Sequence, residues 1–294
     1  MEFDDIRAFV TVANVGSVSM AARDLHITQS AVTRRLQRLE TSLGATLLDR
    51  KTRPVALTKV GQAALERCRR VLNDVREVRV AASNGGPLRG EFRVGVAHAL
   101  TEFTLIEPVG ELRRAFPHLG LQLTTGWSRE VLERVRSGGL DAAVILLAEG
   151  EQLPADVTGI QVAKERLLVV ASRQHYHSRP RKILDLAGAQ WILNPEGCAA
   201  RAGLRRALLH ADIDMVVAVE TYNYELQLAL VAQNRGLTIV PERILGRSRQ
   251  RSRLRTLRVR GLEFPLVVWV VCREPVAGLD GVVAELARSL RETL

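Results

Sequence analysis

One short stretch of the sequence presents side chains suited to reading a nucleic acid. Between Thr28 and Gly44, apolar residues recur at helical spacing, and the opposite face carries amide, hydroxyl and guanidinium groups. The apolar set is Val32, Leu36, Leu39 and Leu43, and the polar set is Gln29, Ser30, Thr33, Arg34 and Gln37. Amides and hydroxyls hydrogen-bond to base edges, whereas arginine pairs with phosphates. The pattern therefore predicts a helix that contacts nucleic acid.

The segments around that helix fit a helix-turn-helix. A first amphipathic helix is expected to end near Gly16, and Ser17 is placed to cap a short helix that precedes the reading helix. Two helices joined by a short turn, the second with an acid-free N-terminal half, are typical of this motif. Further along, Arg50, Lys51 and Arg53 surround a turn and predict a wing along the phosphate backbone. Helical patterning alone leaves open a plain three-helix bundle with a charged face.

Positive charge is concentrated at the N-terminal end of the chain. The 294 residues include 42 lysines and arginines and 32 acidic residues, a net charge of +10. Residues 1–90 hold 15 basic and 9 acidic side chains, so +6 of the +10 lies in less than a third of the chain. A basic head on a nearly balanced body indicates that the head binds a polyanion.

A further helix, expected to start at Thr58, carries a different pattern. Its apolar residues alternate in steps of four and three, which is the 3.5-residue repeat of a coiled-coil seam. The seam consists of Leu57, Gly61, Ala64, Cys68, Val71, Val75, Val78 and Ala82. We expect this helix to pair with a second copy of the chain; the alternative is one amphipathic helix packed on its own domain.

Residues 83–87, Ser-Asn-Gly-Gly-Pro, end that helix and predict a domain boundary. Beyond them, strand-like runs alternate with helical stretches, which predicts parallel sheets flanked by helices and hence α/β lobes. The longest apolar run, 265–272, is too short to span a membrane. The acidic N-terminus is unlike a secretory signal, and the three cysteines have no disulfide or CxxC spacing. We therefore expect a cytoplasmic protein that does not bind membranes.

Motifs for catalysis or cofactor binding are missing from the sequence. It has no GxSxG elbow, Walker loop, HExxH or dinucleotide GxGxxG after a strand, so we expect neither enzyme activity nor a cofactor. His175 and His177 lack nearby Cys, Asp or Glu to complete a metal shell, which favours a solvated loop and no metal. Cys198 has no second cysteine nearby, which disfavours a disulfide switch.

The first 65 or so residues resemble the DNA-binding head of LysR-type transcriptional regulators. The resemblance rests on Ala21-Ala22, Leu25, residues 28–34 (TQSAVTR), Leu39-Glu40, Leu43-Gly44, Leu47, Arg50 and Leu57-Thr58 with Gly61. Thr33 stands where the family usually has serine, and Leu48-Asp49 where it usually has Phe-Glu. The body resembles the family's effector domain less sharply, at Leu140-Asp141-Ala142-Ala143, Leu184-Asp185-Leu186 and residues 236–241 (GLTIVP).

The resemblance implies an organisation and a set of partners. It places a winged helix-turn-helix at 1–58, a dimerisation helix and hinge at 59–86, and an effector-binding domain of periplasmic-binding-protein type at 87–294. Within that domain, lobe I would span about 92–161 and 267–294, and lobe II about 162–266. The implied partners are double-stranded DNA with a palindromic operator, a small-molecule effector and further copies of the chain, as a dimer or a dimer of dimers. It also allows for contact with RNA polymerase.

The resemblance also assigns residues to both binding sites. In the head, Arg34, Arg50, Lys51 and Arg53 would bind phosphates; Gln29, Ser30, Thr33 and Gln37 would read bases, and Ser17 is counted with this DNA-binding set. In the cleft between the lobes, Thr101, Ser128 and helix-opening amides would hydrogen-bond the effector, and Trp127 and Tyr222 would form apolar walls. The remaining expected lining is Leu147, Asn194, Glu196 and Cys198.

Two other functions are weighed against this one. The chain is alternatively an enzyme or small-molecule-binding protein whose head only dimerises, or a protein that compacts DNA without sequence preference.

A run of arginines near the C-terminal end of the second lobe is a separate feature. From Arg247 to Arg255, arginine occupies alternate positions, which would place five side chains on one face if the segment were extended. Arg258 and Arg260 extend the run. The functional interpretations are an acidic partner, a subunit contact or extra phosphate contacts, and a solvated edge strand protected from aggregation is favoured over them.

Overall fold

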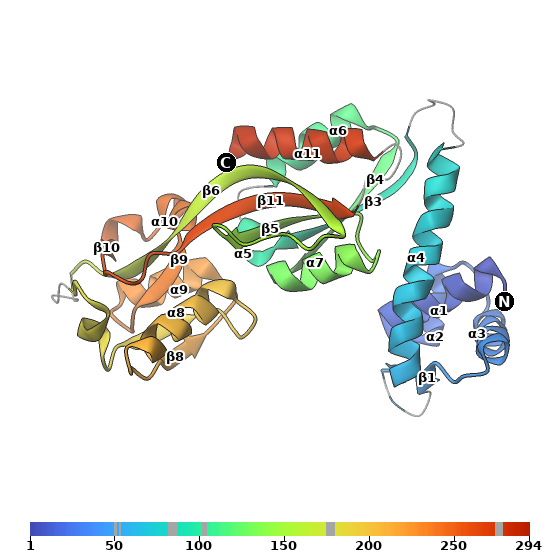
Figure 1. Cartoon of the computed structure of the whole chain (residues 1–294), viewed down its shortest axis with the longest axis horizontal. Coiled ribbons are helices and arrows are strands. Elements are labelled where there is room, and N and C mark those ends of the chain that lie inside the picture. The colour runs from blue at the N-terminus through green and yellow to red at the C-terminus, as the bar shows by residue number, and fades with distance from the viewer. Residues whose placement is uncertain (50–51, 53, 82–87, 102–104, 175–179, 274–278) are drawn as a thin grey trace.

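The computed structural model describes the chain except for residues 50–51, 53, 82–87, 102–104, 175–179 and 274–278. A small helical head lies at one end of the molecule and an elongated α/β body extends to the other (Figure 1). Helix α4 (Lys59–Ala81) belongs to the head end and runs up beside the body. This combination of a helical head and an α/β body confirms the predicted fold class.

The head is built from three helices and a small hairpin, and local capping explains where each helix begins and ends. Helices α1 (Phe3–Val15), α2 (Val18–Asp24) and α3 (Gln29–Leu43) precede the hairpin strands β1 (Leu48–Asp49) and β2 (Ala56–Leu57). Ser17 accepts a hydrogen bond at the start of α2, and Thr28 does so at the start of α3. Gly16 and Gly44 end α1 and α3 in the left-handed conformation.

Helix α4 packs on the head through its N-terminal part. Leu65 and Cys68 are buried in the head core, beside residues of α1 and α3. A Cβ atom at Gly61 would lie 1.9 Å from the carbonyl oxygen of Leu47, so only glycine fits this approach. The expected seam is therefore divided: its first residues contact the chain's own head, whereas Val71 and Val78 further along are 42% and 67% exposed.

The body begins with a sheet whose central strands are parallel. Strand β3 (Gly90–Ala97) lies between β4 (Leu119–Gly126) and β5 (Ala142–Ala148), parallel to both. Helix α7 (Ser128–Arg136) packs on one face of this sheet. Helices α6 (Ile106–Ala115) and α11 (Asp280–Thr293) lie on the other face, and the short α5 (His98–Thr101) directly follows β3. The carboxyl ends of β3, β4 and β5 therefore point toward the rest of the body.

Two long strands connect this part of the body with the second part. Strands β6 (Val157–Ser172) and β11 (Pro265–Arg273) run antiparallel to each other, and β11 is also antiparallel to β5. The expectation of parallel sheets is therefore met only in part, because β11 returns the chain to the first part antiparallel to β5 and β6. Beyond residue 166, β6 continues into the second part, where it pairs with β9 (Thr238–Pro241) and β10 (Leu254–Leu257).

The second part of the body completes the α/β arrangement. Strands β7 (Gln190–Leu193) and β8 (Val216–Glu220) are parallel, and a bridge between Trp191 and Leu237 joins β7 to the segment that leads into β9. Its remaining elements are helices α8 (Ala199–His210), α9 (Tyr224–Ala232) and α10 (Glu242–Arg247), with 3-10 turns at Ile183–Leu186 and Arg251–Arg253. Only the part of the arginine run that lies in β10 is extended; the rest lies at the end of α10, in a turn and in the 3-10 turn. The arginines therefore do not alternate along one strand, as an extended segment would require.

The contact at Gly61 generates a stability prediction. We expect Gly61→Ala to lower the free energy of unfolding of the head by about 1–3 kcal/mol, since the added methyl group meets backbone that cannot move aside. Gly110→Ala is the matched control: this helical glycine has only the end of Arg114 within 4 Å, so the change should be neutral or slightly stabilising. Urea unfolding followed by circular dichroism measures both, and an unchanged Gly61→Ala protein would contradict the close packing.

Candidate DNA interface and effector cleft

Helix α3 presents most of the predicted reading residues together on the surface. Gln29, Ser30, Arg34 and Gln37 are exposed, and Thr33 is half-buried. The Gln29 side-chain oxygen accepts a hydrogen bond from the Ser19 hydroxyl at 3.2 Å, which orients the amide from helix α2. The Thr33 hydroxyl donates to the Gln29 carbonyl at 3.0 Å. The outward face of α3 thus combines amides, a hydroxyl and one guanidinium without a carboxylate.

Ion pairs to helix α1 fix which face of α3 points outward. Asp5 is 1% exposed and accepts hydrogen bonds from the Arg38 guanidinium at 2.6 and 3.2 Å. Asp4 accepts a 2.7 Å bond from Arg35. The charges of Arg35 and Arg38 are therefore neutralised within the head, whereas the adjacent Arg34 is exposed and forms no ion pair with a described residue. Sequence patterning had identified Arg34 but gave no sign that Arg35 serves the interior.

The hairpin predicted as a wing is present, but its cations lie outside the described residues. Strands β1 and β2 pair in antiparallel register, Leu48 opposite Leu57. The Thr52 hydroxyl donates to the Asp49 carbonyl and accepts from the Ala56 amide, each at 3.0 Å, which closes the turn. Arg50, Lys51 and Arg53 are the three residues that the structure does not describe here. Ser17 is half-buried, and its hydroxyl accepts the Met20 amide at 3.4 Å as a helix cap.

Across the body, three aromatic rings join the two parts. His98 and Trp127 follow β3 and β4, whereas Tyr222 precedes helix α9 of the second part. The Trp127 ring centroid lies 4.8 Å from that of His98 and 5.7 Å from that of Tyr222, and the latter pair is stacked. A Cβ atom at Gly197 would lie 2.4 Å from the Trp127 indole, so the second part also touches this ring through glycine backbone. Trp127 therefore spans the expected cleft.

The predicted hydroxyl ligands of the cleft already have partners in the protein. The Thr101 hydroxyl donates to the His98 carbonyl at 2.7 Å, and the Ser128 hydroxyl accepts the Leu146 amide at 3.1 Å. Leu147 is buried in the cluster beneath helix α7. These three residues shape the loops at the ends of β3, β4 and β5.

Asn194 lies at the centre of a buried polar network in the second part. Its amide donates to the Tyr224 hydroxyl at 2.9 Å and contacts the Cys198 sulfur at 3.8 Å. Its oxygen accepts a hydrogen bond from Gln227, whose own oxygen accepts from Thr238 at 3.0 Å. Burial raises the pKa of the Cys198 thiol, so this cysteine stays protonated near neutral pH. The sequence analysis did not identify Tyr224 and Gln227. Both are buried residues of helix α9 whose side chains end in a polar group.

Glu196 is neutralised by neighbouring arginines. Arg201, with a side chain 7% exposed, pairs with Glu196 at 3.0 Å and with Glu220 at 2.8 Å. Arg205 also hydrogen-bonds Glu196 and holds the pKa of that carboxyl below its ordinary value. The repulsion that an anionic ligand would meet at Glu196 is thereby largely offset.

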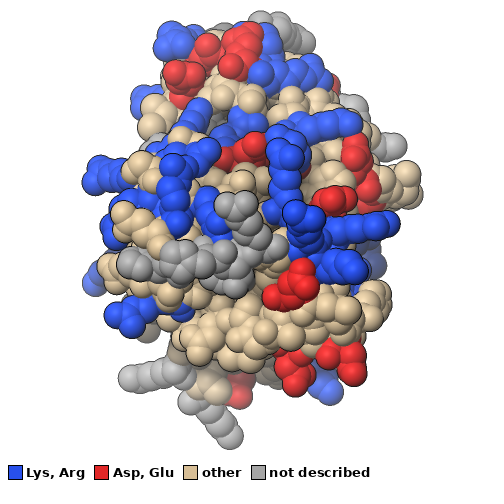
Figure 2. All heavy atoms as spheres, turned by 90° about the vertical axis from the view of Figure 1, so that its left-hand side faces the viewer, with Lys and Arg blue, Asp and Glu red and all other residues tan. Residues whose placement is uncertain are grey.

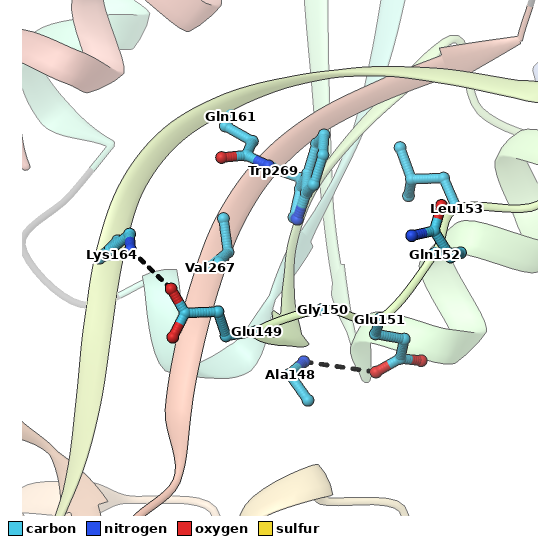
Figure 3. Close-up of a pocket in the computed structure, with 10 residues that line it drawn as sticks. All are labelled: Ala148, Glu149, Gly150, Glu151, Gln152, Leu153, Gln161, Lys164, Val267 and Trp269. Carbon is cyan, nitrogen blue, oxygen red and sulfur yellow. Dashed lines mark hydrogen bonds and ion pairs between the residues drawn. The ribbon is translucent and has the colours of Figure 1, made fainter.

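A separate hollow of about 470 Å³ lies beside the crossover strands (Figure 3). Trp269 and Val267 of β11 and Gln161 of β6 form its walls, and the loop after β5 closes it. Lys164 and Glu149 pair across its rim at 2.6 Å. None of the eight residues expected to bind effector lines this hollow, although Leu147 is adjacent in sequence to Ala148, which does.

Two negative findings apply to the part of the chain that the structure describes. No group of His, Cys, Asp and Glu in it is arranged to hold a metal ion. Within the same residues, no helix has the length and apolarity needed to cross a membrane.

Comparisons with known proteins place this architecture in a family. Residues 3–62 match the model of the bacterial regulatory helix-turn-helix protein, lysR family, and residues 85–294 match the LysR substrate binding domain. The regulator GltR of Bacillus subtilis is 25% identical over 256 residues, covering 87% of this chain and 85% of its own. CzcR of Bacillus anthracis is 28% identical over 242 residues, covering 82% and 81% of the two chains.

Solved structures show the same fold over the whole chain. A full-length OxyR variant of Pseudomonas aeruginosa superposes with a TM-score of 0.76 at 22% identity, covering 99% of this chain and 95% of its own. CbnR complexed with its target DNA has a TM-score of 0.61 at 23% identity, with both chains fully covered. The family matches confirm the prediction of a DNA-binding regulator and not an enzyme. The chain belongs to the LysR family of transcriptional regulators, with a helix-turn-helix head and an effector-binding body.

Proposed function

We propose that the chain binds a palindromic operator as a homodimer, or as a dimer of dimers, with one α3 helix in each major groove. The observation that carries this proposal is the outward face of α3, where Gln29, Ser30, Arg34 and Gln37 are exposed together while Arg35 and Arg38 are tied to α1. Gln29 and Gln37 would read bases, with Ser30 and Thr33 beside them, and Arg34 would bind phosphate. Arg50, Lys51 and Arg53 of the wing would add phosphate contacts.

Pairing through α4 would bring two heads onto one site. Val71 and Val78 are exposed in the single chain and continue the seam beyond the part that packs on the head. A second α4 covering them would remove apolar surface from water. We place the head at residues 1–58, the pairing helix and hinge at 59–86, and the effector domain at 87–294. We also propose a cytoplasmic location and contact with RNA polymerase.

Effector binding would act on the contact between the two lobes. We infer that a small molecule enters at Trp127 and Tyr222, replaces their stacking, and changes the angle between the lobes and so the placement of the heads. The loop residues Thr101, Ser128 and Leu147 would form one side of the site. Asn194, Glu196 and Cys198 at the start of α8 would form the other, with backbone amides as hydrogen-bond donors.

The role of Arg34 is tested by the salt dependence of DNA binding. Arg34→Ala should weaken binding to all duplexes and reduce the slope of log K against log salt by about 1, since one phosphate contact is lost. Arg7→Ala, which removes an exposed arginine from α1, is the matched control and should leave the slope unchanged. Equal slopes for Arg34→Ala and wild type would remove Arg34 from the interface.

The reading role of Gln29 is tested by footprinting on the DNA upstream of the chain's own gene. Wild type should protect a dyad with half-sites about one helical turn, or a multiple of it, apart. Gln29→Ala should lose about 1–3 kcal/mol of binding free energy at that site and almost none on random DNA. If both DNAs lost affinity equally, Gln29 would be a phosphate or packing residue. Equal coverage of both DNAs by wild type would favour DNA compaction.

The aromatic contact across the cleft is tested without an effector. Trp127 stacks on Tyr222, which is itself 55% exposed, so Tyr222→Ala should increase acrylamide quenching of Trp127 fluorescence. Because Trp191 and Trp269 also fluoresce, the same comparison in a Trp127→Phe protein is needed. The difference in quenching should disappear there if it comes from Trp127. Leu226→Ala, at an exposed position of the neighbouring helix α9, is the control and should not change quenching. Unchanged quenching in Tyr222→Ala would show that the lobes do not meet through these rings in solution.

A further inference from the structure

The arginine run forms a strongly basic surface on the second part of the body. Between Glu242 and Glu263 the chain has no carboxylate, and six arginines of this segment are exposed: Arg247, Arg249, Arg251, Arg253, Arg258 and Arg260. We call this surface the arginine face. Figure 2 shows basic side chains spread across the middle of the end of the molecule where strand β10 lies.

The fold adds cations from other segments to this face. The Arg253 carbonyl accepts the Arg173 backbone amide at 2.9 Å, and the Arg260 amide donates to the Arg181 carbonyl at 2.9 Å. Lys182 forms a β-bridge with Arg260. Arg173, Arg181 and Lys182 are all exposed, so three chain segments bring like charges side by side. Repulsion between them disfavours the free protein, and an anionic partner would relieve it.

Four of these cations have no carboxylate partner among the described residues. Arg249, Arg251, Arg258 and Arg260 form no ion pair with any described residue, and Arg253 contacts only the neutral Gln250 side chain, at 3.2 Å. Arg166 and Arg288, two exposed arginines elsewhere in the body, are in contrast paired with carboxylates. The guanidinium donors of Arg249, Arg251, Arg258 and Arg260 are therefore available to an external acceptor.

The composition and position of the face indicate which polyanion fits it. No aromatic residue occurs between Tyr224 and Phe264, so the segment offers no ring on which single-stranded bases would stack. The face lies at the opposite end of the molecule from the head, so duplex held by α3 does not extend to it within one chain (Figure 1). Nearly all its cations are arginine, which is enriched at protein interfaces and pairs with carboxylates through two donors at once, whereas lysine is depleted there.

Strand β10 supplies a backbone template next to these cations. It pairs with β6 on one side and is the last strand in the order of the main sheet, so within the described residues its other edge has no strand partner. An added strand would gain main-chain hydrogen bonds along this edge. We propose that the arginine face binds an acidic segment of another protein, held in extended conformation along β10, while the head remains on DNA.

Fluorescence anisotropy of the full-length protein with a labelled acidic peptide tests this proposal. The probe is a peptide of alternating glutamate and threonine about ten residues long, at physiological ionic strength. Arg249→Ala/Arg251→Ala should weaken its binding by about tenfold, since each exposed pair adds little alone but several act together. Arg113→Ala/Arg129→Ala removes the same charge from exposed positions elsewhere in the body and should leave binding within about twofold of wild type.

Further measurements separate this surface from the DNA-binding head. Arg249→Ala/Arg251→Ala should bind operator DNA as wild type does, which also shows that it is folded. A peptide with proline at its centre should bind more weakly, because proline cannot complete the added strand. Equal peptide binding by the two double variants, or by the proline peptide, would overturn the proposal. So would a loss of duplex binding in Arg249→Ala/Arg251→Ala, which would make the face a second DNA site.

Discussion

The buried carboxylate of Asp5 determines the geometry of the DNA-facing head. A charged group that is almost completely removed from water must be paired, and Asp5 is bonded by the Arg38 guanidinium and by the backbone amide of Glu2. These bonds hold α1 and α3 in one rotational setting. In this orientation the apolar stripe of α3 also faces the core of the head. Hydrophobic packing and the ion pairs therefore favour the same orientation of α3, with the same face toward solvent.

Arg201 in the body is likewise a buried charge that must be paired. This buried cation pairs with Glu196 and Glu220 and donates to the carbonyl of Asn194, which ties the loop before α8 to the end of β8. Because these charges cancel one another, the side of the cleft formed by the second lobe presents no strong net charge to a ligand. Recognition there depends more on the rings of Trp127 and Tyr222 and on backbone amides than on a charged side chain.

The sequence predicted elements that depend on local signals. Ser17, Thr28 and Gly44 mark helix ends by their own chemistry, and the predicted ends of the head helices follow from them. The first half of β6, residues 157–166, was missed because it is polar and is held as a strand only by pairing with β11, about a hundred residues away. Arg34 and Arg35 are indistinguishable by type, and only the position of Asp4 separates their roles. The approach of Trp127 to Tyr222 likewise depends on tertiary structure.

The paired strands β6 and β11 also determine how the two lobes are able to move. They pass side by side between the lobes and are hydrogen-bonded to each other, so sliding one along the other would break several bonds at once. Bending the two-stranded ribbon perpendicular to its plane breaks none. The connection therefore resists shear between the lobes and permits hinge-type bending and twisting of one lobe relative to the other. A signal that passes through the body would reach the head as a rotation of one lobe against the other and not as a sliding movement.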